Sequence, residues 1–289
     1  MTENFTKSGF KNYDKAYLVR SESLRNPGDS AKDDLIANFI TSNTSTEKEI
    51  NILDIGCGMG QTMSKLISKL SDRRKVKLAG IDSSKIGLLK ARNKIKNVDF
   101  VCAAVEAIPF RDSAFDVIIL KDLLEHIPED YLVLSEASRL IKSDGLLIIY
   151  VPHKLHGSFS FESIIQYLFN YNIDEEVGHV RRYDLNEIST LLSEYNFKFK
   201  IKFYNYFGHF VFGIISIIGV KMEKLLQSET NTGNNSKFIE IINRILQVIV
   251  WSGKFEYMWL KKHRGPGLFI VARSIKNKVE LIEDESAKS

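Results

Sequence analysis

Short apolar runs alternate with amphipathic segments through the first half of the chain. Residues 115–120 are apolar at every position but the second, which is typical of a strand buried on both faces of a sheet. Apolar positions at helical spacing, as in residues 84–95, predict helices instead. The pattern predicts strands over residues 50–53, 76–81, 98–102, 115–120 and 146–151, and helices over residues 31–40, 61–70, 84–95 and 129–141.

The pattern changes after Pro152. Residues 153–182 mix polar and aromatic positions, and Asp184 is placed to cap a helix that runs to about residue 195. Residues 199–206 and 268–274 predict the last two strands, and about 60 residues separate them as an insertion. The sequence therefore predicts an α/β fold, with a doubly wound, mostly parallel sheet of seven strands and a helical insertion between the last two.

One large α/β domain is expected over residues 46–275, with the helical, apolar insertion at about 207–263. Residues 1–45 are polar and contain one helix signal, so we expect an N-terminal helical lid segment there. Residues 276–289 are expected to form a disordered, charged tail.

The insertion begins with a strongly apolar run, residues 207–220. A bilayer span needs roughly 20 residues, so this run is short for one. A buried cap, a homodimer contact through residues 207–260 and a peripheral membrane contact stay open as interpretations. A transmembrane helix is the remaining alternative.

Composition limits the classes of protein to consider. Apolar residues make up 44% and charged residues 26% of the 289 positions, as in ordinary soluble domains. The net charge of +4 is mild, so no nucleic-acid partner is expected. Cys57 and Cys102 are the two cysteines and have no ligand or disulfide spacing, so we expect a reducing, cytoplasmic location and no metal. The polar N-terminus lacks the apolar core of a secretory signal.

A glycine-rich turn follows the first expected strand. Gly56, Gly58 and Gly60 stand in G-x-G-x-G spacing before the helix at residues 61–70. Glycines let a backbone approach a ligand closely, and the N–H groups at a helix start add a weak positive end. Gln61 stands where a dinucleotide-binding G-x-G-x-x-G motif has its third glycine, which disfavours NAD or FAD. The turn favours another adenosine cofactor.

Two acidic residues accompany this turn. Asp82 ends the second strand, 26 residues beyond Gly56, and is placed to accept hydrogen bonds from both hydroxyls of a ribose. The alternative for Asp82 is a cap on the next helix. Asp54 stands just before the turn and is placed to reach a cationic amino group, directly or through water. Cys57 is interpreted as a small packing residue.

Five segments resemble the class I S-adenosylmethionine (SAM)-dependent methyltransferases in order and approximate spacing: LDIGCGMG, GIDSS, VEAIPF, FDVIILKDLLEHI and IKSDGLLIIYVP. The resemblance covers about residues 48–200 and is strongest to the methyltransferase type 11, or quinone O-methyltransferase-like, branch. It implies a Rossmann-like methyltransferase fold and SAM as the cofactor. The cofactor site that it implies consists of Asp54, Gly56, Cys57, Gly58, Gly60, Asp82, Ser83, Ala104, Val105, Glu106 and Lys121.

The loop after the third strand departs from the family's pattern. Many members carry an aspartate where this chain has Ala104. An adenine contact through that side chain is therefore not expected, and backbone groups near Val105 are expected to make it instead.

The residues after the fourth strand are expected near the transferred methyl group. Methyl transfer to a hydroxyl needs a proton acceptor there, and Lys121, Asp122, Glu125 and His126 follow that strand. The Glu125-His126 pair is similar to one at this place in quinone and phenol O-methyltransferases. We therefore hypothesise that His126 is the general base. The alternative is a residue that packs at a helix start beside Pro128.

A second polar cluster, residues 178–185, precedes the helix that Asp184 is placed to cap. His179, Arg181 and Tyr183 are expected to face the substrate, and an arginine there can bind an anionic group bidentately. Similar GHxRRY runs occur in a branch of the family linked with sugar, lipid or quinone substrates. The alternative is that the arginines bind carboxylates on the adjacent helix.

These observations predict an enzyme that transfers the methyl group of SAM to an oxygen of a small or lipid-like molecule, in preference to a nitrogen or carbon. Two alternatives stay open. One is a nucleotide-dependent oxidoreductase on a similar fold. The other is a non-catalytic SAM-fold scaffold at a membrane or partner surface. The expected location is cytoplasmic, with membrane association through the insertion as a further option.

Overall fold

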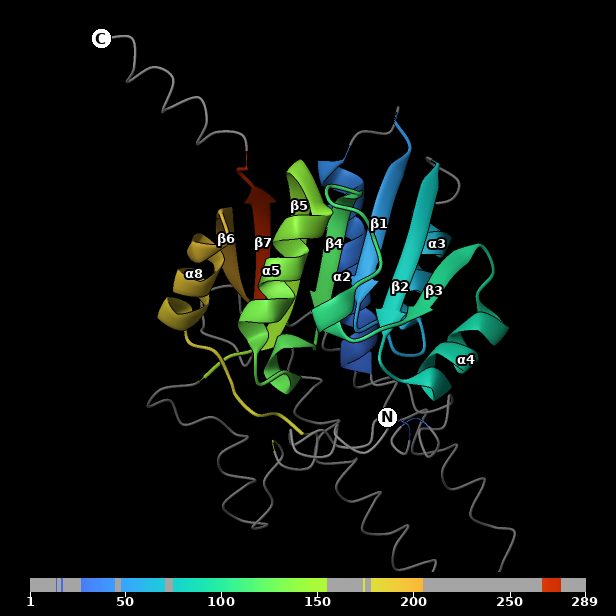
Figure 1. Ribbon diagram of the computed structural model, residues 1–289, viewed down its shortest axis with the longest axis horizontal. Coiled ribbons are helices and arrows are strands. Elements are labelled where there is room, and N and C mark those ends of the chain that lie inside the picture. The colour runs from blue at the N-terminus through green and yellow to red at the C-terminus, as the bar shows by residue number, and fades with distance from the viewer. Residues whose placement is uncertain are drawn as a thin grey trace, which may run out of the picture.

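The computed structural model describes residues 14, 17, 27–44, 48–70, 75–154, 174, 178–204 and 267–276. The expected insertion, most of the expected lid segment and nearly all of the expected tail lie outside the described residues. The described part of the chain is a sheet with helices on both faces (Figure 1).

Seven strands form one mixed sheet. They are β1 (Ile50–Ile55), β2 (Val76–Asp82), β3 (Val98–Cys102), β4 (Phe115–Lys121), β5 (Ile141–Pro152), β6 (Phe197–Tyr204) and β7 (Gly267–Ser274). Their order across the sheet is β3-β2-β1-β4-β5-β7-β6. Strands β1 to β5 pair in parallel, whereas β7 runs antiparallel to both β5 and β6. This confirms the expected doubly wound, mostly parallel sheet.

Helices cover both faces of the sheet. They are α2 (Pro27–Asn43), α3 (Gln61–Leu70), α4 (Lys85–Lys94), α5 (Asp130–Leu140) and α8 (Leu185–Glu194), with two 3-10 turns, η2 (Val105–Ala107) and η3 (Leu124–His126). Leu134 of α5 and Leu192 of α8 belong to one buried cluster, whereas Ile36 of α2, Leu66 of α3 and Leu88 of α4 belong to the other. Figure 1 shows α5 in front of the sheet and α2 behind it. No helix within the described ranges is long and apolar enough to span a bilayer.

Two helix boundaries differ from the sequence prediction. Helix α2 begins at Pro27 instead of residue 31, because proline suits a first helical turn, where no N–H donor is needed. Helix α5 ends at Leu140, and β5 begins at once instead of after Gly145. Asp144 has a φ of +59° and the β4–β5 register shifts nearby, so a strand irregularity takes up these turn-forming residues.

The carboxyl ends of the parallel strands meet at one edge of the sheet, where ligands bind in doubly wound folds. Asp54 lies near the end of β1 and is paired with Gly80. Asp82 ends β2 opposite Cys102, and Lys121 ends β4. The sheet therefore gathers the predicted cofactor residues at this edge.

Candidate active site

The glycine-rich turn leaves β1 at this edge in a conformation that favours glycine. Gly56, Gly58 and Gly60 have φ values of +79°, +52° and +76°, a region that residues with a Cβ adopt at a cost. The N–H groups of Gly56 and Cys57 donate to the carbonyl oxygen of Ile81 at 2.8 and 2.9 Å. These bonds tie the turn to β2 immediately before α3 begins.

Cys57 packs inside this turn. Its side chain is buried, and a Cβ on Gly80 would lie 2.8 Å from its Sγ. Burial raises the pKa of the Cys57 thiol, and the negative charges of Asp54 and Asp82 raise it further. A buried, protonated thiol is not a nucleophile, so Cys57 contributes packing and a backbone N–H group.

Asp82 joins the turn to the start of α4. Its carboxylate accepts hydrogen bonds from the N–H groups of Gly58 at 2.7 Å and Ser84 at 2.8 Å. Ser84 is the residue that caps α4, because its hydroxyl accepts from the Gly87 N–H. Burial raises the pKa of Asp82, and the two N–H donors oppose that rise. Each carboxylate oxygen has a second lone pair, which suits it to a ribose hydroxyl.

Asp54 is a buried acid at the end of β1, with 2% of its surface exposed. Burial raises the pKa of its carboxyl to about 7; Lys121 opposes the rise, and the charges of Asp33 and Asp82 add to it. A positive charge would offset the cost of burying this carboxylate. Asp54 is therefore suited to a cationic group of a ligand, and with Asp82 and the turn it fits an amino-acid-bearing nucleoside.

Lys121 is bound to another residue at this edge. Its ammonium group lies 2.7 Å from Asp33 Oδ1 of α2, and Thr62 Oγ1 of α3 donates to the same oxygen at 2.8 Å. Both Lys121 and Asp33 are almost fully buried. Lys121 therefore balances charge beside Asp54 and fixes α2 and α3 against the end of β4.

Lys32 is a second buried lysine that sequence analysis missed. Its ammonium group lies 2.8 Å from Asp122 and 4.2 Å from the centroid of the Tyr150 ring. The sequence did indicate it. Lys32 and Asp33 each stand four positions, about one helical turn, before a buried apolar residue of α2, so both lie on its buried face. Charged residues on the buried stripe of a helix indicate ion pairs.

Four further predicted residues lie on the loops that follow β2 and β3. The N–H of Ala103 donates to the Asp82 carbonyl oxygen at 3.3 Å, which places the loop after β3 next to the end of β2. The four residues on these neighbouring loops are Ser83, which is exposed, Ala104 and Val105, which are half-buried, and Glu106, which is exposed. Their place agrees with a border for an adenine ring, which stays a prediction.

Besides Lys32 and Asp33, two further described residues of the expected lid segment contact this site. Asp14 accepts hydrogen bonds from Ser84 Oγ at 2.5 Å and from the Ile86 N–H at 3.3 Å. A Cβ on Gly58 would lie 2.5 Å from the hydroxyl of Tyr17, so that ring lies against the glycine turn. At these two positions the N-terminal segment covers the candidate cofactor site.

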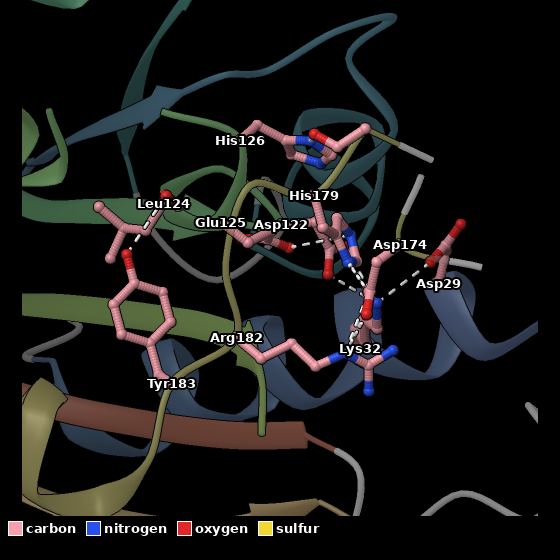
Figure 2. Close-up of polar contacts among 11 residues, drawn as sticks. Asp29, Lys32, Asp122, Leu124, Glu125, His126, Asp174, His179, Arg182 and Tyr183 are labelled. Atoms are coloured by element: carbon pink, nitrogen blue, oxygen red, sulfur yellow. Dashed lines mark hydrogen bonds and ion pairs between the residues drawn. The ribbon is translucent and has the colours of Figure 1, made fainter. Parts of the chain in front are cut away.

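A second cluster forms where η3 meets the segment before α8 (Figure 2). His126 Nδ1 lies 3.1 Å from the Gly178 carbonyl oxygen, and His179 Nδ1 lies 2.8 Å from Asp174 Oδ1. The centroids of the two imidazole rings are 4.9 Å apart. The structure therefore brings together two predicted site residues from segments far apart in the sequence.

Glu125 lies beside these two histidines and is 1% exposed. Its Oε1 is 3.9 Å from His179 Nε2, and its Oε2 has no hydrogen-bond partner in the described part of the chain. Burial raises the pKa of Glu125 well above its ordinary range, and the negative charge of Asp122 adds to that rise. Its backbone carbonyl oxygen accepts from the Val180 N–H at 2.8 Å, which fixes the two segments together.

Arg181 and Tyr183, predicted to contact substrate, both bind Asp130 at the start of α5. Arg181 Nη1 and the Tyr183 hydroxyl each donate to Asp130 Oδ2 at 2.7 Å, and Arg181 Nη2 also donates to the Pro128 carbonyl oxygen. Arg182 donates to Asp174 at 2.8 Å. The carboxylates that these two arginines bind, Asp130 and Asp174, lie outside α8, which is the helix adjacent to this segment. A substrate contact by Arg181 or Tyr183 stays a prediction.

Comparison with known proteins identifies the domain. Residues 46–187 match a family model described as a methyltransferase domain. The chain is 37% identical over 119 residues to a Bacillus subtilis protein provisionally named a 23S rRNA (guanine-N(1)-)-methyltransferase, covering 41% of this chain and 40% of the relative. It is 32% identical over 136 residues to the ubiquinone biosynthesis O-methyltransferase of Pelagibacter ubique, covering 45% and 54%. The chain thus spans about half the length of these relatives.

The fold has a counterpart among solved structures. Phosphoethanolamine N-methyltransferase 2 of Haemonchus contortus, in complex with S-adenosyl-L-methionine, superposes with a TM-score of 0.56 at 19% identity, covering 93% of this chain and 58% of that one. At this identity the likeness concerns the fold, and it confirms the Rossmann-like methyltransferase architecture. Residues 46–187 of this chain thus match the methyltransferase domain family.

Proposed function

We propose that this protein binds SAM and transfers its methyl group to an acceptor. The observation that carries the proposal is the Asp82 carboxylate, which holds the Gly58 N–H of the glycine turn and the Ser84 N–H at the start of α4. Asp54 adds a buried negative charge nearby. Gln61, in place of a third glycine, and the match of residues 46–187 to methyltransferase domains favour SAM over a dinucleotide.

The residues at this edge have separate roles in the proposal. When bound, SAM supplies an activated sulfonium methyl group. Asp82 accepts hydrogen bonds from the ribose hydroxyls, and Asp54 binds the amino group of the methionine part. Backbone groups around Val105 border the adenine. The glycine turn, fixed to Ile81 by two N–H donors, gives this ligand a preorganised surface.

We place the acceptor beside Glu125, His126 and His179, because η3 follows β4 at the same edge of the sheet. The proposed acceptor atom is an oxygen of a small or lipid-like molecule. The Pelagibacter relative, named for ubiquinone biosynthesis, supports this choice. The Bacillus relative is named for rRNA, but the mild net charge of +4 disfavours a nucleic-acid acceptor here. A homodimer or peripheral membrane contact through residues 207–260 stays a prediction outside the described residues.

Calorimetry of the full chain tests the cofactor. We expect the wild type to bind SAM and S-adenosylhomocysteine with 1:1 stoichiometry and to show no heat of binding with NAD. No binding of either SAM compound would overturn the proposal, and binding of NAD alone would favour the oxidoreductase alternative. Binding of SAM without methyl transfer to any pool of quinols, phenols or lipids would favour the scaffold alternative.

His126 is the proposed general base. The Gly178 carbonyl oxygen accepts a hydrogen bond, so the His126 proton is assigned to Nδ1 and the lone pair to Nε2. We expect His126→Ala to lower turnover by about 10²–10⁴-fold, because the proton acceptor is lost. The rate is measured with labelled SAM and an acceptor from the quinol and phenol panel. A variant that turns over at the wild-type rate would remove His126 from the mechanism.

A further inference from the structure

We propose that Glu125, His126 and His179 form a binding site for a divalent transition-metal ion of the zinc class. Each residue offers one ligand atom, and the three atoms lie within 4.8 Å of one another. The residues come from η3 and from the segment before α8, which face each other in Figure 2. Cysteine spacing alone predicts no metal, because these ligands are distant in sequence and include no cysteine.

The unsatisfied oxygen of Glu125 is the first argument for an ion. Glu125 Oε2 is buried and lacks a hydrogen-bond partner among the described residues. The two basic side chains drawn near it in Figure 2, Lys32 and Arg182, already bind Asp122 and Asp174. The charge of Lys32 attracts the Glu125 carboxylate but does not offset its burial, which is costly without a directly bound cation. A metal ion between Glu125 and the imidazoles would supply that charge.

The orientation of His179 is the second argument. Its Nδ1 lies 2.8 Å from Asp174 Oδ1, and its Nε2 faces Glu125 Oε1 at 3.9 Å. A carboxylate on the far nitrogen is the usual partner of a metal-bound imidazole, because it fixes the tautomer and the ring. His126 has the same arrangement, with Nδ1 at 3.1 Å from the Gly178 carbonyl oxygen. With Nδ1 of each ring donating its proton, Nε2 carries the lone pair that a metal would take.

The backbone fixes the two ligand segments relative to each other. The Val180 N–H donates to the Glu125 carbonyl oxygen at 2.8 Å, and the N–H groups of Gly178 and His179 both donate to the Asp174 carbonyl oxygen at 2.8 Å. Ligand atoms in a tetrahedral zinc site lie about 3.4 Å apart, given bonds of about 2.1 Å. The three ligand atoms already lie within 4.8 Å of one another. Side-chain rotation, with the two segments held in place, would bring them to the tetrahedral separation.

The ligand types decide the class of ion. Two imidazoles and one carboxylate suit Zn²⁺ or Fe²⁺, whereas Mg²⁺ and Ca²⁺ prefer oxygen ligands. The site coincides with the proposed acceptor position, and a bound ion there would lower the pKa of an acceptor hydroxyl. With the ion bound His126 would be a ligand, so its proposed role as general base applies to the metal-free protein. Metal binding itself rests on these side chains and does not depend on SAM.

The test is metal binding by the full chain without SAM or acceptor. Protein stripped with EDTA and freed of the chelator is titrated with Co²⁺, whose visible absorption reports nitrogen and oxygen ligation. We expect one equivalent of Co²⁺ to bind, Zn²⁺ to displace it and Mg²⁺ not to displace it. Absence of stoichiometric Co²⁺ binding, or displacement by Mg²⁺ as readily as by Zn²⁺, would overturn the proposal. Calorimetry with SAM is a separate measurement, so either proposal can fail alone.

Variants assign the ligands. Glu125→Gln and His179→Gln are expected to weaken Co²⁺ binding at least about 100-fold, and Asp174→Asn about 10–100-fold. Glu129→Gln, which removes an exposed acid four residues from Glu125, should keep the wild-type affinity. Wild-type affinity in Glu125→Gln would contradict the proposal. Glutamine keeps the shape of the buried acid, so this variant should fold even if a histidine variant does not, and melting in EDTA checks that.

Discussion

Asp82→Ala is expected to weaken the binding of S-adenosylhomocysteine by roughly 10²–10⁴-fold. In the proposed complex the Asp82 carboxylate accepts two ribose hydroxyls, and a hydrogen bond to a charged group contributes about 1.5–3 kcal/mol. Losing two such bonds corresponds to about 3–6 kcal/mol. The same carboxylate holds the N–H groups of Gly58 and Ser84, so the turn also loses part of its fixed geometry. Calorimetry gives the dissociation constants.

Two variants make this result specific. Asp99→Ala removes an exposed carboxylate from the neighbouring strand β3 and should bind like the wild type. Asp82→Asn keeps the side-chain size and one acceptor oxygen, so its affinity should fall between those of Asp82→Ala and the wild type. Thermal melting shows whether each variant is folded. Wild-type affinity in a folded Asp82→Ala would show that Asp82 is not the ribose ligand.

The order of strands and helices was predictable because each element carries its own local pattern. The strand 98–102 and the helix 61–70 have the predicted boundaries, and the other strands of the first half differ by a few residues. The largest error lies at residues 141–145, where Ser143, Asp144 and Gly145 have the composition of a turn. Ile141 and Leu146 pair with β4 on either side of them, so these residues form an irregularity within the strand, and such pairing is a non-local property.

The cofactor edge was predictable for a related reason. The glycine turn and Asp82 each follow directly on a strand, and parallel strands bring their carboxyl ends together. The partners that set the electrostatics were not predictable, because they are distant in sequence. Lys121 lies 88 residues from Asp33, and Lys32 lies 90 residues from Asp122. Such ion pairs form only when the folded sheet places α2 beside the end of β4, so the sequence alone does not indicate which residues pair.

The substrate segment shows the same limit. The sequence singles out Arg181 and Tyr183 by their residue types, but it does not contain the information that Asp130 binds both. It likewise predicts His126 and His179 as separate candidates. Their approach to a ring separation of 4.9 Å, beside a buried Glu125, depends on how the segment before α8 crosses η3. The chemistry of that cluster is therefore a property of the folded chain.

Asp54 is expected to make cofactor binding depend on pH. Burial raises the pKa of its carboxyl to about 7 in the free protein, and a cationic amino group binds the deprotonated form. The affinity is therefore fully present above this pKa and is lost as the pH falls through it. For a pKa of about 7, the affinity for S-adenosylhomocysteine should fall about eight-fold between pH 7.5 and pH 6. At pH 6, binding should release about 0.9 proton, as calorimetry in buffers of different ionisation enthalpy would measure.

Asp54→Asn separates this carboxyl from the other groups that titrate near pH 7. Removing one partner of a buried charge pair costs about 2–5 kcal/mol, so at pH 7.5 we expect affinity to fall by roughly 30-fold or more. The variant should also lose the proton release and the slope between pH 7.5 and pH 6, whereas Asp99→Asn on β3 should retain both. If the slope persists unchanged in Asp54→Asn, the titrating group lies elsewhere and Asp54 does not bind the amino group. If both affinity and slope disappear, the negative charge at the end of β1 selects the cofactor by its cationic end.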